Sequence, residues 1–316
     1  MVNYEIIQGD CIQTMKGLPA GSVQTCVTSP PYYGLRCYNG GDAEIGLEST
    51  PEQYVAKLVD VFREVRRVLR DDGTLWLNLG DSYNGSGGAG GDYGVGGLKE
   101  GQPKYPGRRV DGLKPKDLIG IPWSVAFALR ADGWWLRSEI IWHKKAPMPE
   151  SVTDRPTRAH EQVFLLTKSA KYFYDADAIR EPNEGQMTQY RLQNGYEQAG
   201  PKRQGLEDNG THGRGGFPKP LNPNGRNKRS VWTLGPESYG GAHFATMPTK
   251  LVEPCILAGS KVGDTVLDPF NGSGTTGAVA LKHGRKYIGC ELNPDYIELA
   301  HDRIRRSQPM LLEVTA

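Results

Sequence analysis

The sequence predicts an α/β protein whose sheet is mostly parallel and carries helices on both faces. Strand-like and helix-like runs alternate along much of the 316-residue chain, which is the pattern of parallel strands joined by crossover helices. Near the C-terminus, Gly272, Gly274 and Gly277 stand in a G-x-G-x-x-G spacing between a predicted strand and a predicted helix. This context is typical of Rossmann-like nucleotide-binding folds.

The first part of the chain contains the longest predicted helix. Thr50 can cap it, Pro51 fits its first turn, and Gln53 completes a capping box. An apolar stripe at helical spacing follows, formed by Val55, Leu58, Val59, Phe62, Val65 and Leu69. The pair Asp72-Gly73 is expected to stop this helix. Strands are predicted around it at residues 5–8, 23–28 and 74–79.

Two irregular segments interrupt the later alternation. We expect a long mobile loop over about residues 80–117 and an irregular insertion over residues 181–230. A helix is predicted between them at 122–130, and strands at 135–142 and 162–167. After the insertion we predict helices at 249–257, 275–283 and 294–306, and strands at 265–268 and 287–290. Residues 1–180 and 231–316 are therefore expected to form two halves of one domain.

Composition excludes several classes of protein. No apolar run approaches the roughly 20 residues of a membrane span, and the N-terminal MVNYEIIQGD is not a basic and apolar signal segment. The five cysteines form no C-x-x-C pair and the six histidines no H-E-x-x-H motif, so we expect neither a disulfide framework nor a metal. These features predict a cytoplasmic protein.

The stretch TSPPYYGLRC follows the second predicted strand and offers groups that could hold a flat substrate. The Ser29 hydroxyl and the Pro30 carbonyl can accept hydrogen bonds. Pro31 restricts the backbone before it and so helps to aim that carbonyl. The ring of Tyr32 can stack on an aromatic base. Tyr33 receives no role from the sequence.

The glycine-rich stretch DTVLDPFNGSGTTG predicts a cofactor site. Glu291 follows about 20 residues after the loop, at the end of the next predicted strand, where it can accept from both ribose hydroxyls. Asp268 precedes the loop and would repel a pyrophosphate there. A cofactor with a cationic end fits better, and S-adenosyl-L-methionine has an ammonium, a sulfonium and a ribose. Asp268 is expected to serve the cationic side.

Together, TSPPYYGLR and VLDPFNGSGTTG resemble the DNA amino-methyltransferases, which methylate N6 of adenine or N4 of cytosine. The order of the two motifs is that of the family's permuted beta class, and the resemblance covers most of the chain. It extends to linking stretches such as IIQGDCIQTMKGLPAGSV and LRSEIIWHKKAPMPESVTDRPTRAHEQVFLLTK. The resemblance implies a Rossmann-like methyltransferase fold with circularly permuted motifs, plus a target-recognition insertion.

The resemblance also implies roles for matching positions. Ser29, Pro30, Pro31 and Tyr32 would form the catalytic tetrapeptide. The cofactor would be bound by Asp10, Cys11, Thr28, Phe244, Pro248, Asp268, Phe270, Gly272, Ser273, Gly274, Thr275 and Glu291. The target base must leave the DNA helix to reach such a pocket. Ser29 at the first tetrapeptide position favours N4 of cytosine, with N6 of adenine as the alternative.

Other functions remain open at this point. Methylation at C5 of cytosine needs a cysteine nucleophile, and Cys255 follows a proline, but its apolar surroundings indicate a buried structural thiol. A methyltransferase acting on RNA or on a protein glutamine could use a similar Pro-Pro-Tyr bend. An NAD-linked oxidoreductase is disfavoured by Asp268, and a DNA-binding module without activity would not need the glycine loop.

Basic residues concentrate in the insertion and favour a polyanion as partner. We expect double-stranded DNA to be contacted by Lys202, Arg203, Arg214, Lys219, Arg226, Lys228 and Arg229. By resemblance, the protein would associate with the nucleoid through DNA binding, in a host of bacterial or phage type. A homodimer and a cognate restriction endonuclease are further partners that the class suggests.

Overall fold

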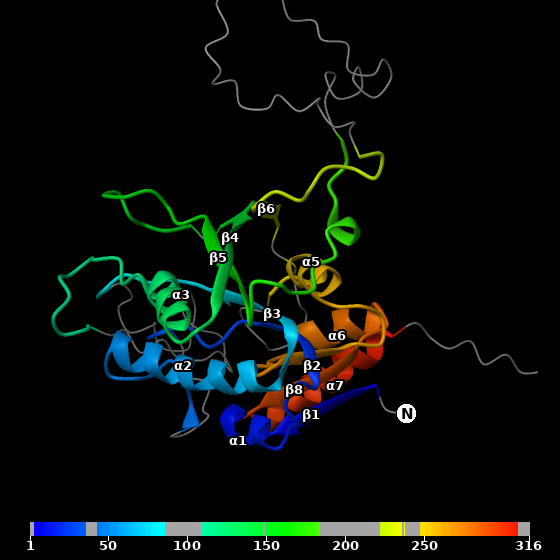
Figure 1. Ribbon diagram of the computed structural model, residues 1–316. Helices are drawn as coiled ribbons and strands as arrows, with labels where there is room; N and C mark the ends of the chain where they lie inside the picture. Colours follow the sequence, from blue (N-terminus) through cyan, green and yellow to red (C-terminus); the bar gives the residue numbers. More distant parts are fainter. Residues whose placement is uncertain are drawn as a thin grey trace, which may run out of the picture. The chain divides into compact units, whose positions relative to one another are not determined.

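The computed structural model describes residues 3–35, 43–85, 109–147, 149–183, 222–235, 237 and 247–308. The chain divides into two compact units. The larger unit comprises Met1–Asp175 and Ser230–Ala316, and the smaller one Ala176–Arg229. Figure 1 shows the order of the elements along the chain.

The larger unit is built on an eight-stranded sheet within the described residues. Its strands are β1 (Tyr4–Gln8), β2 (Val23–Thr28), β3 (Leu69–Leu79), β4 (Trp135–Lys144), β5 (His160–Thr167), β6 (Val231–Leu234), β7 (Thr265–Asp268) and β8 (Lys286–Glu291). They lie in the order β1-β8-β7-β2-β3-β5-β4-β6. β5 is antiparallel to both neighbours, and the other neighbouring pairs are parallel. The predicted mostly parallel sheet is therefore confirmed.

Helices cover the sheet in two groups. They are α1 (Cys11–Lys16), α2 (Pro51–Val68), α3 (Ile121–Ala131), α5 (Thr249–Gly259), α6 (Thr275–Lys282) and α7 (Pro294–Ser307). α1, α2 and α3 pack in succession against one another, and α5, α6 and α7 do the same. None of the helices in the described ranges is long and apolar enough to cross a membrane.

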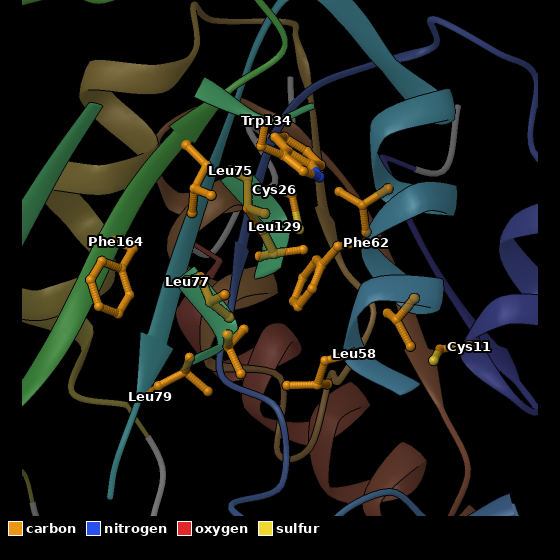
Figure 2. Close-up of a cluster of buried hydrophobic side chains, with 14 of the residues drawn as sticks. Cys11, Cys26, Leu58, Phe62, Leu75, Leu77, Leu79, Leu129, Trp134 and Phe164 are labelled. Atoms are coloured by element: carbon orange, nitrogen blue, oxygen red, sulfur yellow. The ribbon is translucent and has the colours of Figure 1, made fainter. Parts of the chain in front are cut away.

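The long helix α2 begins where the sequence predicts and ends earlier. Thr50 Oγ1 accepts the Gln53 backbone N–H at 3.2 Å, and Gln53 Oε1 accepts the Ser49 N–H at 3.1 Å. Leu58 and Phe62 on the buried face of α2 lie against the side chains of β3, as Figure 2 shows. These contacts account for the amphipathic pattern of the helix.

The pair Asp72-Gly73 does not stop α2, which ends at Val68. β3 starts at Leu69, and its register with β2 shifts between the pairs Val23–Leu69 and Thr25–Thr74. Asp72-Gly73 lies in the resulting irregularity. A Cβ on Gly73 would come within 2.9 Å of the Arg70 carbonyl oxygen, so a glycine relieves this bulge.

Asn84 closes the base of the irregular segment that follows β3. Its side chain is 2% exposed and donates to the carbonyls of Val110, Leu113 and Lys114, while its Oδ1 accepts the Val110 N–H. An isolated bridge joins Tyr83 to Leu118 nearby. The two ends of the expected 80–117 loop are therefore fixed to each other, and residues 86–108 lie outside the described part.

Candidate active site

The carboxyl edge of the parallel strands gathers the residues that the two motifs supply. Asp10 follows β1, Glu291 ends β8, Asp268 ends β7 and Thr28 ends β2. These four strands are consecutive in the sheet, and Gln8 pairs directly with Glu291. The chain leaves β7 toward β8 and leaves β2 toward β3, in opposite directions. Ligands of open α/β sheets bind at such switch points, outside the carboxyl ends of the strands.

Glu291 holds the glycine loop. Its Oε2 accepts the Gly272 backbone N–H at 2.7 Å, and its Oε1 accepts the Asn293 N–H at 2.9 Å. Gly272 has a φ of +50°, which a glycine adopts without strain. Burial raises the pKa of Glu291, and the charge of Asp268 adds to the effect. Each carboxylate oxygen retains a lone pair with which a ligand hydroxyl could be bound.

Asp268 lies inside the protein at the start of the same loop. It is 2% exposed, and its Oδ1 accepts from the Thr28 hydroxyl at 2.6 Å and from the Phe270 backbone N–H at 3.0 Å. Burial raises the pKa of Asp268 to about 6, although the bonds from Thr28, Thr276 and Phe270 act in the opposite direction. The structure thus surrounds this carboxylate with protein donors.

Two glycines of the motif allow close packing of α6. Gly274 has a φ of +75°, and a Cβ there would lie 2.8 Å from Cβ of Ala300 in α7. A Cβ on Gly277 would lie 2.6 Å from the ring of Tyr287 in β8. Directly before Gly274, the Ser273 hydroxyl accepts a bond from Arg303 at 2.9 Å, and Thr275, directly after it, begins α6. The spacing of these glycines therefore also serves the contact of helix with helix and strand.

A buried pair below the loop was not predicted from the sequence. The hydroxyl of Tyr287 donates to Oδ1 of Asn271 at 2.8 Å, and Asn271 Nδ2 donates to the Gly272 carbonyl at 2.8 Å. Gly289 makes room for this amide, since a Cβ there would lie 2.7 Å from Asn271 Oδ1. These contacts fix the middle of the loop against β8.

Asp10 and Cys11 form the start of α1. Asp10 Oδ1 accepts the Gln13 N–H at 2.9 Å and so caps the helix. Cys11 is 7% exposed. Burial, helped by the charge of Asp10, raises the pKa of its thiol to about 12. Its thiol is therefore neutral and can offer only an apolar surface beside the strand ends.

The tetrapeptide leaves β2 next to the glycine loop. The hydroxyl of Tyr54 in α2 donates to the Pro31 carbonyl at 2.8 Å and so fixes the position of the second proline. Among the described residues, none donates a hydrogen bond to the carbonyl of Pro30. Tyr33, which the sequence left without a role, is 2% exposed, and its ring packs against Tyr54 with centroids 5.6 Å apart.

Tyr32 is held on two sides. Its hydroxyl donates to Glu161 Oε2 at 2.7 Å, and Ser29 Oγ donates to the same hydroxyl oxygen at 3.4 Å. Gly80, directly after β3, lets the chain pass the ring, because a Cβ there would lie 2.3 Å from Tyr32 Cε2. Burial and the nearby Glu161 charge raise the pKa of Tyr32 well above its usual value. The phenol therefore stays protonated.

Glu161 reaches this edge because β5 is antiparallel. The strand begins at His160 on the side where its neighbours β3 and β4 end, and Glu161 pairs with Trp142 near the end of β4. The other carboxylate oxygen of Glu161 binds the Lys144 ammonium. Sequence reasoning missed Glu161, because only the antiparallel direction of β5 brings it to Tyr32. It also missed Asn78 and Gly80, which the pairing of β3 with β2 brings to the same ring.

For the other predicted residues the structure gives local surroundings alone or no description. Pro248 stands before α5, where its carbonyl accepts the Leu251 N–H at 2.9 Å. Arg226, Lys228 and Arg229 belong to the smaller unit. The remaining predicted positions, Phe244, Lys202, Arg203, Arg214 and Lys219, lie outside the described residues.

In the smaller unit, two of the predicted DNA-binding arginines share one carboxylate. Glu181 Oε2 lies 3.2 Å from Arg226 Nε and 2.9 Å from Arg229 Nε. Burial of Glu181 works against its charge, yet the bonds and charge of Arg229 hold the pKa of that carboxyl below its usual value. This group of three side chains keeps one net positive charge.

Cys255 lies in the interior of α5. Cys255 is 1% exposed, and its thiol donates to the Leu251 carbonyl within α5, as expected of a structural thiol. The described residues contain no cluster of three or more His, Cys, Asp or Glu side chains suited to a metal ion.

Comparison with known proteins identifies the family. The sequence profile of a DNA methylase family, that of the N6 and N4 methyltransferases, matches residues 23–302. The type II methyltransferase M.Cfr9I of Citrobacter freundii is 45% identical over 318 residues, which cover 98% of this chain and 91% of that protein. M.SmaI of Serratia marcescens is 44% identical over 309 residues and covers 96% of this chain, with 91% of its own length matched.

Solved structures show the same fold. PvuII DNA methyltransferase, a cytosine-N4-specific enzyme, superposes with a TM-score of 0.64 at 18% identity, over 96% of this chain and 86% of that one. A DNA modification methylase candidate of Thermus thermophilus, solved with S-adenosyl-L-methionine, gives a TM-score of 0.60 at 24% identity over 97% and 95% of the two chains. With its profile match and its close relatives, the chain belongs to the N4/N6 DNA amino-methyltransferase family.

Proposed function

We propose that this protein methylates N4 of cytosine at a specific site in double-stranded DNA, after the base has turned out of the helix. The observation that carries the choice of cytosine is Ser29 in the first tetrapeptide position. Members of the family with serine there mostly resemble cytosine-N4 enzymes, as the motif comparison above implies. The similarity to type II methyltransferases supports a defined recognition site.

The methyl donor is S-adenosyl-L-methionine, which supplies an activated methyl group when bound. The residues at the carboxyl edge fit this cofactor. Glu291 keeps one lone pair on each carboxylate oxygen for the ribose hydroxyls. Its hydrogen bond with the Gly272 N–H also fixes the backbone of the glycine loop. Asp268 is enclosed by Thr28 and Phe270, so we infer that it supports the cofactor through the loop that it fixes.

The tetrapeptide suits an attack by an exocyclic amino group. Such a nitrogen shares its lone pair with the aromatic ring, and it becomes a better nucleophile when acceptors take its hydrogens. Ser29 Oγ and the Pro30 carbonyl are two such acceptors at the end of β2. Displacement at the activated methyl then needs mainly positioning, and no covalent intermediate with the protein is required.

Analysis of the modified nucleoside tests the proposal. Mixed-sequence double-stranded DNA is incubated with cofactor labelled in its methyl group, digested to nucleosides and separated. We expect label in N4-methyl-2′-deoxycytidine from the natural protein and none from the Ser29→Ala variant, which should still bind the cofactor. Label in N6-methyl-2′-deoxyadenosine would reject the choice of cytosine. In parallel incubations with RNA and with protein, label there but not in DNA would reject a DNA substrate.

The basic residues of the insertion are proposed to contact DNA phosphates. Arg229 is exposed and adds to the net positive charge of its cluster with Glu181. In binding titrations, Arg229→Gln should weaken DNA binding and lower the slope of log K against log salt concentration by about 1. Lys286→Gln is the control, because Lys286 is exposed at the opposite end of β8 from Glu291. An unchanged slope would argue against this contact.

The cellular setting is proposed from the same relatives. Their type II names support a restriction-modification system in which a cognate endonuclease cuts the unmethylated site, and a cytoplasmic location at the nucleoid. A homodimer remains a proposal from the class. Sedimentation of the protein alone tests the homodimer. A search in the host for an endonuclease whose cleavage of DNA is blocked by this methylation tests the restriction-modification system.

A further inference from the structure

We propose that Glu161 is a positioning residue that sets the direction of a hydrogen-bond chain running from Ser29 through Tyr32. This inference rests on the proposed function, since it concerns how the tetrapeptide receives the amino group of the base. The chain is formed by three side chains from β5 and from the turn after β2.

The direction of the chain follows from what each group can donate. An ionised carboxylate only accepts, so the Tyr32 hydroxyl gives its single hydrogen to Glu161 Oε2 at 2.7 Å. The Tyr32 oxygen then has lone pairs left and accepts the Ser29 hydrogen at 3.4 Å. Ser29 Oγ consequently turns its own lone pairs away from Tyr32. Ser29 Oγ is then an acceptor for a hydrogen of the amino group, and the proposed reaction requires such an acceptor.

Asn78 strengthens this order. It is 2% exposed, and its Nδ2 donates to Glu161 Oε2 at 3.2 Å and to the Gln162 carbonyl at 3.1 Å. These two acceptors fix the orientation of the amide and leave Asn78 Oδ1 3.3 Å from the Tyr32 hydroxyl. The phenol hydrogen therefore faces two acceptors, and the shorter distance, 2.7 Å against 3.3 Å, favours Glu161 Oε2.

Lys144 is the counter-ion that stabilises the mostly buried carboxylate of Glu161. The side chain of Glu161 is 13% exposed, and its Oε1 binds the Lys144 ammonium, which also lies 4.8 Å from the centroid of the Trp142 ring. Glu161 thus uses one oxygen for its counter-ion and the other for Tyr32 and Asn78. A glutamine would keep the shape but could present an N–H to Tyr32, which would permit the reverse direction of the chain.

A double-mutant cycle between Glu161 and Tyr32 tests the inference. Glu161→Gln and Tyr32→Phe are each expected to lower kcat by about 10- to 100-fold, the loss typical of a hydrogen bond to a charged group. KM for DNA and Kd for S-adenosyl-L-methionine should change less than about threefold, because the ring and the cofactor loop stay in place. Glu161→Gln should cost little further activity in the Tyr32→Phe background, since Glu161 acts through the lost hydroxyl.

The control is Glu253→Gln, a carboxylate of α5 that pairs with His283 and Lys282. It should leave kcat unchanged. Full activity of Glu161→Gln, or an equal loss on both backgrounds, would overturn the inference while leaving the proposed function intact. Absence of DNA methylation by the natural protein would instead reject the proposed function, and the catalytic role of the chain with it.

Discussion

Thr28 and Asp268 lie 240 positions apart in the sequence, and the Thr28 hydroxyl donates to the Asp268 carboxylate across 2.6 Å. Thr28 directly precedes the tetrapeptide, and Asp268 directly precedes the glycine-rich loop. Their strands, β2 and β7, are neighbours in the sheet. This single bond therefore fixes the two motifs of the active site against each other.

Asp268→Asn is expected to remove a pH-dependent contribution to stability. Burial raises the pKa of Asp268 from 3.8 to about 6, so the folded protein keeps this proton over a range in which the unfolded chain has lost it. The contribution favours folding below pH 3.8 and declines as the pH rises to about 6. Two pKa units correspond to about 3 kcal/mol of unfolding free energy. Urea unfolding at pH 4, 5, 6 and 7 measures it.

The comparison is made as a difference between the natural protein and the variant. The raised pKa of Glu291 also adds a pH dependence, but Glu291 is present in both proteins and so cancels to first order. Stability of the natural protein should fall relative to the variant across this window. A constant difference would mean that Asp268 is not buried as described.

Gly274→Ala should impair both folding and cofactor binding. The residue has a φ of +75°, and the new methyl would lie 2.8 Å from Ala300 Cβ and 3.0 Å from its Cα. We expect a loss of about 2 to 4 kcal/mol in unfolding free energy, from backbone strain together with overpacking. Gly21→Ala, with a φ of +66° and no atom within 4 Å of the new methyl, should show the strain alone. Equal losses in the two variants would contradict the role of the contact with α7.

Gly80→Ala should lower turnover while cofactor binding is kept. The added methyl would lie 2.3 Å from Tyr32 Cε2, so the ring must move away from its place beside Glu161. We expect at least a tenfold loss in kcat, measured by methyl transfer to DNA, and an unchanged Kd for the cofactor. Gly235→Ala is the control, because no atom lies within 4 Å of its new methyl. Normal turnover of Gly80→Ala would show that the position of Tyr32 is not critical.

Tyr287→Phe should remove the hydrogen bond that joins the glycine loop to β8. The substitution leaves the buried Oδ1 of Asn271 without its 2.8 Å donor, which costs about 1 to 3 kcal/mol. Thermal unfolding should show the loss, and calorimetric titration should show weaker cofactor binding. If stability falls while cofactor affinity is unchanged, the pair supports the fold but not the loop geometry.

Cys255→Ala should retain methyl transfer. The thiol is 1% exposed and donates to Leu251 inside α5, so it cannot attack a base. A modest loss of stability, about 1 kcal/mol, is expected from the small cavity. Loss of activity without loss of stability would reopen the interpretation of this residue as a nucleophile.

Much of the fold could be predicted because local signals and periodicity agree in it. β2 and β7 have the predicted bounds, α2 begins where its cap indicates, and α6 begins at the predicted residue. The short helix α1 and the strand β6 were missed, since six and four residues are too few to show a period. The bulge at Asp72-Gly73 was mistaken for a helix stop because a glycine serves both purposes.

The candidate site also contains residues that the sequence predicts and residues that it does not. Its two motifs are contiguous in sequence, and their residue types state their chemistry. Glu161 meets Asn78 only through the pairing of β5 with β3, and Gly80 meets Tyr32 only through the pairing of β3 with β2. A single sequence does not reveal which strands pair or in which direction. Arg226 and Arg229 showed their charge in the sequence but not their shared partner Glu181.

Asn84 also bears on how this protein can be altered. The buried side chain of Asn84 forms hydrogen bonds with the backbone of residues 110–114. The two ends of the intervening stretch are therefore held close together. The cost of closing a loop grows only slowly with its length. Changing the number of residues between positions 86 and 108 should therefore cost little unfolding free energy, as long as Asn84 keeps its contacts.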